Sequence, residues 1–238
     1  MEATNPNPRK YNSISPSAKV LLLMKGHTTL PFARQAAELM SYPGAFNPDF
    51  TNNDFSFWAR VAHFESRYRG IDQLLSGLSI KNILELSSGF SFRSMEAVAQ
   101  NYIHYIDTDL PEIIEKKKEC VAALQKQMAE MKGKLELLPL NALDEKQFTE
   151  TVNHFQQGEL VIVNEGLLVY PSTEEKEKLC RIIRAVLKQR GGYWITADIY
   201  IKSRELKNSL KFDDELERFL EQHQVEDNKF DSLQAAED

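Results

Sequence analysis

The chain has 238 residues with a formal net charge of −6, and 42% of its residues are hydrophobic. This length and composition fit a globular protein with one substantial core and argue against a wholly disordered chain. Because there is no basic excess to match a phosphate backbone, we expect no nucleic-acid partner. The longest apolar run, Val20–Met24, is far shorter than the roughly 20 residues that span a bilayer, so we expect no membrane segment either.

Cysteine usage is typical of a reducing compartment. The chain has two cysteines, Cys120 and Cys180, without a Cys-x-x-Cys motif, and its polar N-terminus does not resemble a secretory signal. Both cysteines fall on helical patterns, where we expect them to be reduced and buried. These features predict a cytoplasmic protein.

The first 80 residues are expected to form a helical cap that precedes the sheet, after a polar tail at residues 1–14. Ser15 is a good N-cap followed by a first-turn proline, and Asp54 caps a long helix with an apolar stripe on one face. The expected elements are a helix from Ser15 to Gly26, a helix over Pro31–Met40, a loop over Tyr42–Asn53 and the long helix from Asp54 towards Leu78.

From residue 81 to residue 238, short apolar runs alternate with amphipathic helical patterns, which predicts a doubly wound, mostly parallel Rossmann-like α/β sheet. The expected strands are Ile83–Leu86, Tyr102–Ile106, Leu135–Leu140, Leu160–Asn164 and Tyr193–Ala197. The helices expected between them include Pro111–Gly133, Asp144–His154 and Ser172–Gly191. The segment from Lys202 onward is polar and helix-prone, so a C-terminal hairpin that would complete such a sheet is expected to be truncated here.

A ligand site is predicted where the first strand ends, because ligands of open parallel sheets bind beyond the carboxyl ends of the strands. The turn Ser87-Ser88-Gly89 holds small residues but only one glycine. It therefore leaves room for a nucleoside but makes a poor pyrophosphate cradle. Glu85 precedes the turn inside a buried strand, where a carboxylate needs a partner. It either helps to hold a ligand ammonium or, in the alternative, is tied to a lysine beside an ordinary turn.

Two acids follow the second predicted strand, about 20 residues after the turn, where a carboxylate commonly receives ribose hydroxyls. These are Asp107 and Asp109. We expect at least one of them to bind the ligand. In the alternative, Asp109 caps the helix that begins at Pro111.

Three segments together resemble the leucine carboxyl methyltransferase family: ILELSSGFSFR, YIDTDLPEIIEKK and NEGLLVYPSTEE. This family includes protein phosphatase carboxyl methyltransferases and bacterial O-methyltransferases of polyketide type. The resemblance spans about Ser15 to Ala197 and implies a class I fold with S-adenosylmethionine as cofactor.

The resemblance also implies roles for individual residues. Gly89, with Ser87 beside it, would lie against the methionine portion of the cofactor, Asp109 would receive the ribose, and Glu165 would stand at the edge of the active site. The remaining implied contacts are Asn141 at the adenine, and Lys19 and Arg67 at the methionine carboxylate. The sequence departs from the family pattern in its Ser-Ser-Gly turn and in Asn141, where an acid is usual.

The predicted reaction is transfer of a methyl group to an oxygen of a small molecule or peptide. A carboxylate acceptor is already ionised at neutral pH, whereas a hydroxyl needs a base, for which His63 and Tyr170 are candidates. The five histidines share no metal-ligand spacing, so we expect no metal. The departures above leave open a binding module without catalysis, and the missing glycines disfavour a nicotinamide oxidoreductase. Tyr42, Phe55, Phe57 and Trp58 either line the acceptor pocket or, as is more common, pack in the core.

Overall fold

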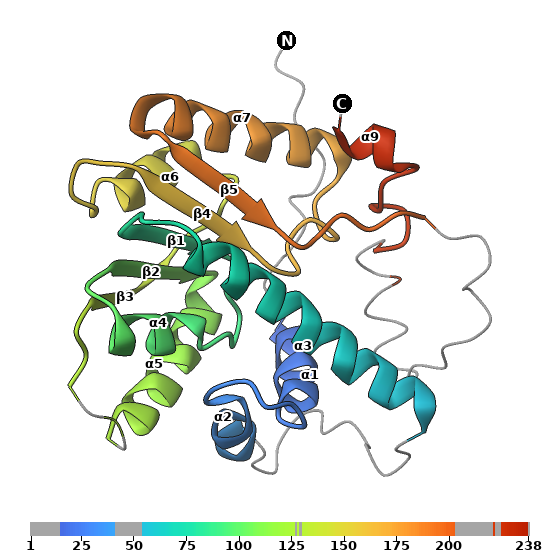
Figure 1. Ribbon diagram of the computed structural model, residues 1–238. Helices are drawn as coiled ribbons and strands as arrows, with labels where there is room; N and C mark the ends of the chain where they lie inside the picture. The colour runs from blue at the N-terminus through green and yellow to red at the C-terminus, as the bar shows by residue number, and fades with distance from the viewer. Residues whose placement is uncertain are drawn as a thin grey trace.

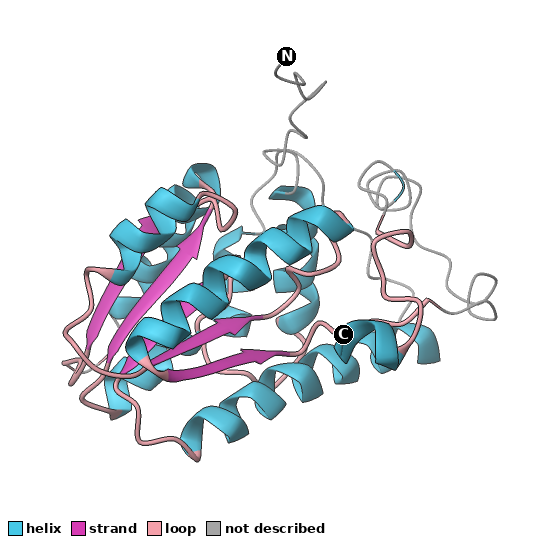
Figure 2. Cartoon of the chain, turned by 90° about the horizontal axis from the view of Figure 1, so that it is seen from above, coloured by secondary structure: helices cyan, strands magenta, loops and turns pink. Residues whose placement is uncertain are grey.

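The computed structural model describes residues 15–40, 54–126, 128, 130–202, 221 and 225–237. Its centre is a five-stranded parallel sheet in the order β3-β2-β1-β4-β5 (Figures 1 and 2). The strands are β1 (Asn82–Leu86), β2 (His104–Asp109), β3 (Lys134–Pro139), β4 (Leu160–Asn164) and β5 (Gly192–Thr196). The strand order reverses direction between β1 and β4, which makes the carboxyl ends of these two strands the expected ligand position.

Helices cover both faces of the sheet, as Figure 2 shows, so the predicted doubly wound α/β fold is confirmed. On one face, α6 (Glu145–Val152) and α7 (Thr173–Arg190) pack on Leu84, Leu86 and Ile162. The opposite face carries α3 (Phe55–Ser76), α4 (Arg93–Gln100) and α5 (Pro111–Gln125). Because both faces are covered, every residue of β1 and β4 is buried, and β4 is apolar except for Asn164.

The three predicted N-terminal helices are present, and the predicted cap of the third, Asp54, is confirmed. The helices α1 (Ser15–Lys25) and α2 (Ala33–Met40) pack against each other, and α2 also contacts α5. At the start of α3, the Asp54 side chain accepts a hydrogen bond from the backbone N–H of Phe57 at 2.9 Å. The helix α2 begins two residues later than predicted, because Phe32 has a φ of 62°, outside the range of a right-handed helix.

Several predicted boundaries were wrong. The strand β2 begins at His104 and continues to Asp109, so both acids lie within the strand instead of after it. Its pairing with β3 extends as far as Asp109 opposite Pro139, which keeps the end of the strand extended. The helix α5 ends at Gln125, well before Gly133. A Cβ at Gly133 would lie 2.4 Å from the carbonyl oxygen of Ile103, so glycine is needed for this close approach.

The aromatic and cysteine predictions were correct only in part. Phe57 is buried among α1 and α3 residues, whereas Phe55 and Trp58 are exposed and do not line the cavity described below. Cys120 is buried, but Cys180 is exposed on the outer face of α7. Both thiols are free. Tyr42 lies outside the described residues, as do the predicted tail at 1–14 and the loop at 42–53.

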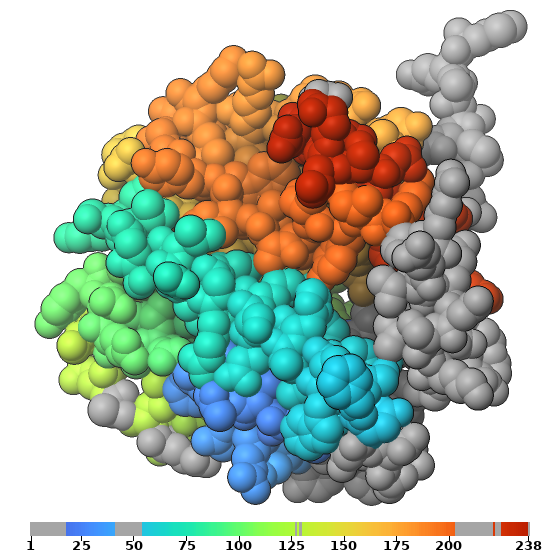
Figure 3. Space-filling view, turned by 45° about the vertical axis from the view of Figure 1, so that its right-hand side comes forward, coloured from blue at the N-terminus to red at the C-terminus, as the bar shows by residue number. Residues whose placement is uncertain are grey.

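The C-terminal segment 225–237 returns to the sheet domain and lies against the start of α7, as Figure 3 shows in red beside orange. Lys176 donates a hydrogen bond from α7 to the carbonyl oxygen of Asn228, and Ile201 forms a parallel bridge with Phe230. The short helix α9 (Leu233–Glu237) follows. Most of the helix-prone stretch after Lys202 lies outside the described residues. Among the helices that the structure describes, none is long and apolar enough to cross a membrane.

Candidate functional site

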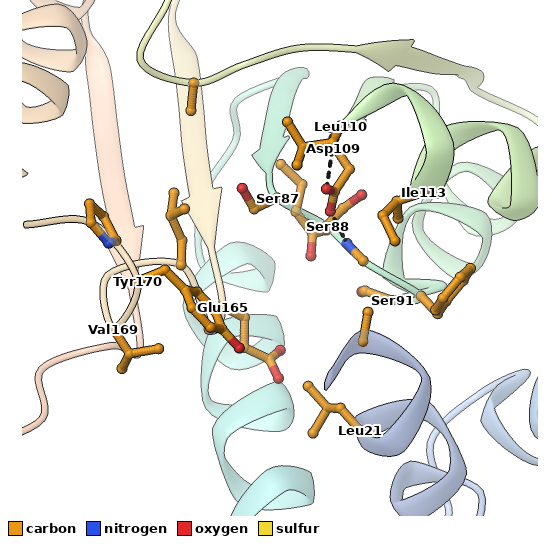
Figure 4. Close-up of a pocket in the computed structure, with 18 of the residues that line it drawn as sticks. Leu21, Ser87, Ser88, Ser91, Asp109, Leu110, Ile113, Glu165, Val169 and Tyr170 are labelled. Atoms are coloured by element: carbon orange, nitrogen blue, oxygen red, sulfur yellow. Dashed lines mark hydrogen bonds between the residues drawn. The ribbon is translucent and has the colours of Figure 1, made fainter. Parts of the chain in front are cut away.

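A cavity of about 490 Å³ opens at the carboxyl ends of β1, β2 and β4. Its walls come from the turn after β1, the end of β2, the loop after β4 and the helices α1 and α3. Figure 4 shows Ser87, Ser88 and Asp109 on one side of this space and Glu165 and Tyr170 on another. Segments far apart in the sequence therefore meet at the reversal of strand order, where the ligand site was expected.

The turn after β1 is held in an unusual backbone conformation. Ser87 and Gly89 have φ values of 48° and 50°, in the left-handed region that costs a non-glycine residue free energy. The Gly89 N–H donates to Asp109 Oδ2 at 2.7 Å, and the Leu110 N–H donates to Asp109 Oδ1 at 2.7 Å (Figure 4). Asp109 does not cap α5, whose N-cap is Leu110 without a side-chain bond. Its carboxylate is instead fixed at the cavity wall.

Asp107 does not reach the cavity. Its carboxylate is fully buried, forms an ion pair with Lys117 at 2.8 Å and accepts a hydrogen bond from the Ser94 hydroxyl at 2.5 Å. Burial, opposed by Lys117, raises the pKa of Asp107 to about 6. Since Asp107 does not line the cavity, Asp109 is the acid of this strand that a ligand could reach.

Glu85 is buried and paired, although its partner is an arginine and not the lysine of the alternative prediction. Its carboxylate accepts hydrogen bonds from Arg93 Nη1 at 2.8 Å and from the Tyr105 hydroxyl at 2.5 Å. Arg93 lies at the first position of α4 and stacks over the Tyr68 ring at 4.0 Å. Arg93 was not among the predicted site residues, because its only signal in the sequence is its place just after the small-residue turn.

Glu165 lies at the centre of a buried cluster of three cations. Its oxygens accept from Lys25 at 2.8 Å, from Arg67 at 3.2 Å and from Arg93 at 2.9 Å. Only 4% of the Glu165 side chain is exposed. Burial raises its pKa, but the combined effect of the three cations is larger and holds the pKa of Glu165 below its ordinary range. The carboxylate therefore stays ionised at neutral pH.

The cation that α1 brings to the cavity is Lys25, whereas the prediction named Lys19. Lys19 does not line the cavity. Helical spacing explains the difference, because Ala18, Leu21, Leu22 and Lys25 repeat every three to four residues and present one face to the cavity. This stripe is the signal that would have identified Lys25.

The other predicted residues take distinct places on the wall. Arg67 lines the cavity and also donates a hydrogen bond from Nη1 to the Tyr200 hydroxyl. Asn141 lines it too, but its side-chain oxygen already accepts the Leu143 N–H at 3.0 Å. Tyr200, which follows β5, was missed because nothing in its sequence context marks it.

Two candidate bases lie at the cavity. Tyr170 and His63 both line it, and His63 Nε2 is 3.4 Å from the Tyr200 hydroxyl. Burial, reinforced by the nearby Arg67, lowers the pKa of His63, so its imidazole is neutral at pH 7. Within the described ranges, no group of three or more His, Cys, Asp or Glu side chains could hold a metal ion.

No protein-family model matches the chain, and no curated protein matches its sequence. Solved structures do resemble it. One is a Staphylococcus aureus protein assigned to the caffeoyl-CoA O-methyltransferases, with 17% identity and a TM-score of 0.47 over 89% of this chain and 86% of that one. Another is the magnesium protoporphyrin IX methyltransferase of Synechocystis with bound S-adenosylmethionine, with 11% identity and a TM-score of 0.41 over 76% and 74%.

An O-methyltransferase family protein from Burkholderia thailandensis shares 14% identity, with a TM-score of 0.42 over 59% of this chain. The match spans 40% of that protein and 41% and 46% of two further structures, less than half of each. At these identities and scores the likenesses carry no argument about activity. The strand order and parallel pairing of this chain themselves define its fold.

Proposed function

We propose that this protein is an S-adenosylmethionine-dependent methyltransferase that methylates an oxygen atom. The observation that carries the proposal is the pairing of Gly89 with Asp109 at the wall of a cavity that also holds Glu165, Lys25 and Arg67. A carboxylate can accept hydrogen bonds from ribose hydroxyls. In the charged cluster, the cations suit the carboxylate of an amino acid and Glu165 suits its ammonium group. The resemblance of three sequence segments to the leucine carboxyl methyltransferase family supports the same cofactor.

Both the nucleoside end and the methionine end of the cofactor would contact side chains that can hydrogen-bond or ion-pair with them. Asp109 would accept the ribose hydroxyls beside the Ser87–Gly89 turn, and Asn141 would lie near the adenine. Lys25 and Arg67 would bind the methionine carboxylate, with Lys25 in the role that the sequence suggested for Lys19. When bound, the cofactor supplies an activated methyl group on a sulfonium.

The surrounding residues supply alignment and exclusion of water more than acid–base chemistry. Methyl transfer to an oxygen is a direct displacement, which depends chiefly on holding the reactants in line. A carboxylate acceptor of a small molecule or peptide would need no base. A hydroxyl acceptor would deliver its proton to the neutral His63 imidazole, which stands beside Tyr200 at the cavity.

The test is isothermal titration with S-adenosylmethionine and S-adenosylhomocysteine. We expect Arg67→Met to weaken the affinity for both at least about tenfold, or roughly 1.4 kcal/mol, because a buried cation would be lost from the carboxylate site. Arg69→Met is the matched control, since Arg69 is on the same helix, pairs with Glu65 at 3.0 Å and does not line the cavity. An absence of binding to the unmodified protein would refute the proposal.

Activity needs a separate measurement. Transfer of a labelled methyl group from S-adenosylmethionine to a panel of carboxylic acids, phenols and alcohols would identify the acceptor class. Loss of hydroxyl but not carboxylate methylation in His63→Ala would assign the histidine as the base. Binding of both cofactor forms without any turnover across the panel would instead indicate a module without catalysis.

A further inference from the structure

Behind the turn that carries Gly89 lies an ion pair that the proposed function does not use. Lys117 of α5 and Asp107 of β2 pair at 2.8 Å, and both side chains are 0% exposed. Neither residue lines the cavity. Burying both charges costs a large desolvation free energy, so this pair is weak evidence for a contribution to stability alone.

Two buried serines hydrogen-bond to this pair from different elements. Lys117 Nζ donates to Ser88 Oγ at 2.9 Å, and the Ser94 hydroxyl donates to Asp107 Oδ2 at 2.5 Å. Ser94 belongs to α4, whereas Ser88 is the central residue of the turn after β1. The ammonium of Lys117 therefore reaches the turn directly, from a part of α5 that does not line the cavity.

The turn needs such an anchor because its backbone is strained. Ser87 and Gly89, on either side of Ser88, both have left-handed φ values. A non-glycine residue keeps this conformation only when its surroundings over-determine it. The Ser88 N–H bonds to the carbonyl oxygen of Thr108 at 2.8 Å, so backbone and side chain fix Ser88 from β2 and α5 respectively.

We propose that Lys117 is a positioning residue for the cofactor site: through Ser88 Oγ it holds the Ser87–Gly89 turn so that the Gly89 N–H meets Asp109. Asp107 keeps the ammonium in place. This inference rests on the proposed function for its ligand, but it makes a claim about the ligand-free turn as well. A purely structural ion pair would instead stabilise the fold without affecting the turn more than the rest of the core.

Ser88→Ala and Ser94→Ala form a matched pair for the first test. Each removes one buried hydroxyl from the same ion pair, but only Ser88 belongs to the turn. We expect Ser88→Ala to weaken S-adenosylhomocysteine binding about tenfold and Ser94→Ala to change it less than about twofold, with similar melting temperatures. Equal effects of the two variants on affinity would overturn the proposal.

Ser88 also lines the cavity, so a double-mutant cycle separates its own contact with the ligand from the action of Lys117. The second background is the neutral pair Lys117→Met with Asp107→Asn, which removes both charges without leaving one buried alone. In that background we expect Ser88→Ala to cost less than about twofold in affinity, because its partner is already gone. A full tenfold loss there would show that Lys117 does not act through Ser88.

Hydrogen exchange of the Gly89 amide in the ligand-free protein tests the inference without the cofactor. We expect exchange to become at least about tenfold faster in Ser88→Ala and in the neutral-pair variant, and to stay unchanged in Ser94→Ala. Unchanged protection in all three would overturn the positioning role. If exchange changes as expected but the unmodified protein binds no S-adenosylhomocysteine, the proposed function fails while the positioning role stands.

Discussion

Replacing Glu165 by glutamine should destabilise the protein strongly, because this carboxylate is the anion shared by three buried cations. Lys25, Arg67 and Arg93 all donate to it within 3.2 Å, and only 4% of its side chain is exposed. Arg93 would keep Glu85 and Asp72 as partners. Lys25 and Arg67 would face a neutral amide in place of a carboxylate.

The magnitude follows from the burial of the cluster. Breaking a buried ion pair by removing one partner costs about 3–5 kcal/mol, because the other charge is left without compensation. For a chain of this length each kcal/mol shifts the melting temperature by about 2–4 °C, so we expect a decrease of roughly 6–20 °C. The measurement is thermal unfolding followed by circular dichroism, with urea unfolding at 25 °C for the free energy.

Glu177→Gln provides the control. Glu177 pairs with Arg181 at 3.6 Å on the surface of α7, with 64% and 68% of the two side chains exposed. Such a pair contributes at most about 1 kcal/mol, so the control should unfold almost like the unmodified protein. If Glu165→Gln changed the free energy of unfolding no more than Glu177→Gln does, the reasoning about the buried cluster would be refuted.

Three further predictions concern the fold. Gly192→Ala should lower the free energy of unfolding by about 3 kcal/mol or more, because a Cβ there would lie 2.0 Å from a carbonyl oxygen of β4 and the residue has a φ of 110°. The control is Gly70→Ala in the middle of α3, where a Cβ would meet nothing within 4 Å, and it should raise the free energy of unfolding by about 0.5–1 kcal/mol. Phe148→Ala should cost about 3–5 kcal/mol in urea unfolding, because this ring is fully buried between α6 and the sheet. Burial raises the pKa of Glu136, but hydrogen bonds from Lys134 and two histidines outweigh it and hold the pKa at about 2. The stability that ionised Glu136 contributes is therefore present above about pH 4.5 and lost as the pH falls towards 2. In unfolding curves measured between pH 5 and 2.5, Glu136→Gln should therefore lose less stability on acidification than the unmodified protein does.

Each of these predictions has a clear contrary result. Equal stabilities of Gly192→Ala and Gly70→Ala would mean that the strand edge can shift to admit a side chain. A loss below about 1 kcal/mol for Phe148→Ala would mean that the core collapses into the space of the ring. A Glu136→Gln variant whose acid unfolding parallels that of the unmodified protein would show that the cluster around Glu136 does not form.

The sequence by itself determined the order of elements and the end of the sheet at which the candidate site lies. The strand Leu160–Asn164 and the capping box from Ser172 to Glu175 occur as predicted. Such features depend on residues that are neighbours along the chain, so apolar runs, caps and small-residue turns reveal them. The same local signals located the turn at Gly89 beside an acid of the next strand.

Only the tertiary structure decided which side chains face the cavity. Asp107 and Asp109 point to the same face of β2, yet α4 and α5 cover Asp107 while Asp109 lies at the open end of the strand. Lys25 replaces Lys19 because the rotation of α1 against its neighbours selects one of its faces. The partners of Glu165 come from positions 72 to 140 residues away, and contacts between such distant segments leave no pattern in the local sequence. They form because the reversal of strand order between β1 and β4 brings these segments to the same edge of the sheet.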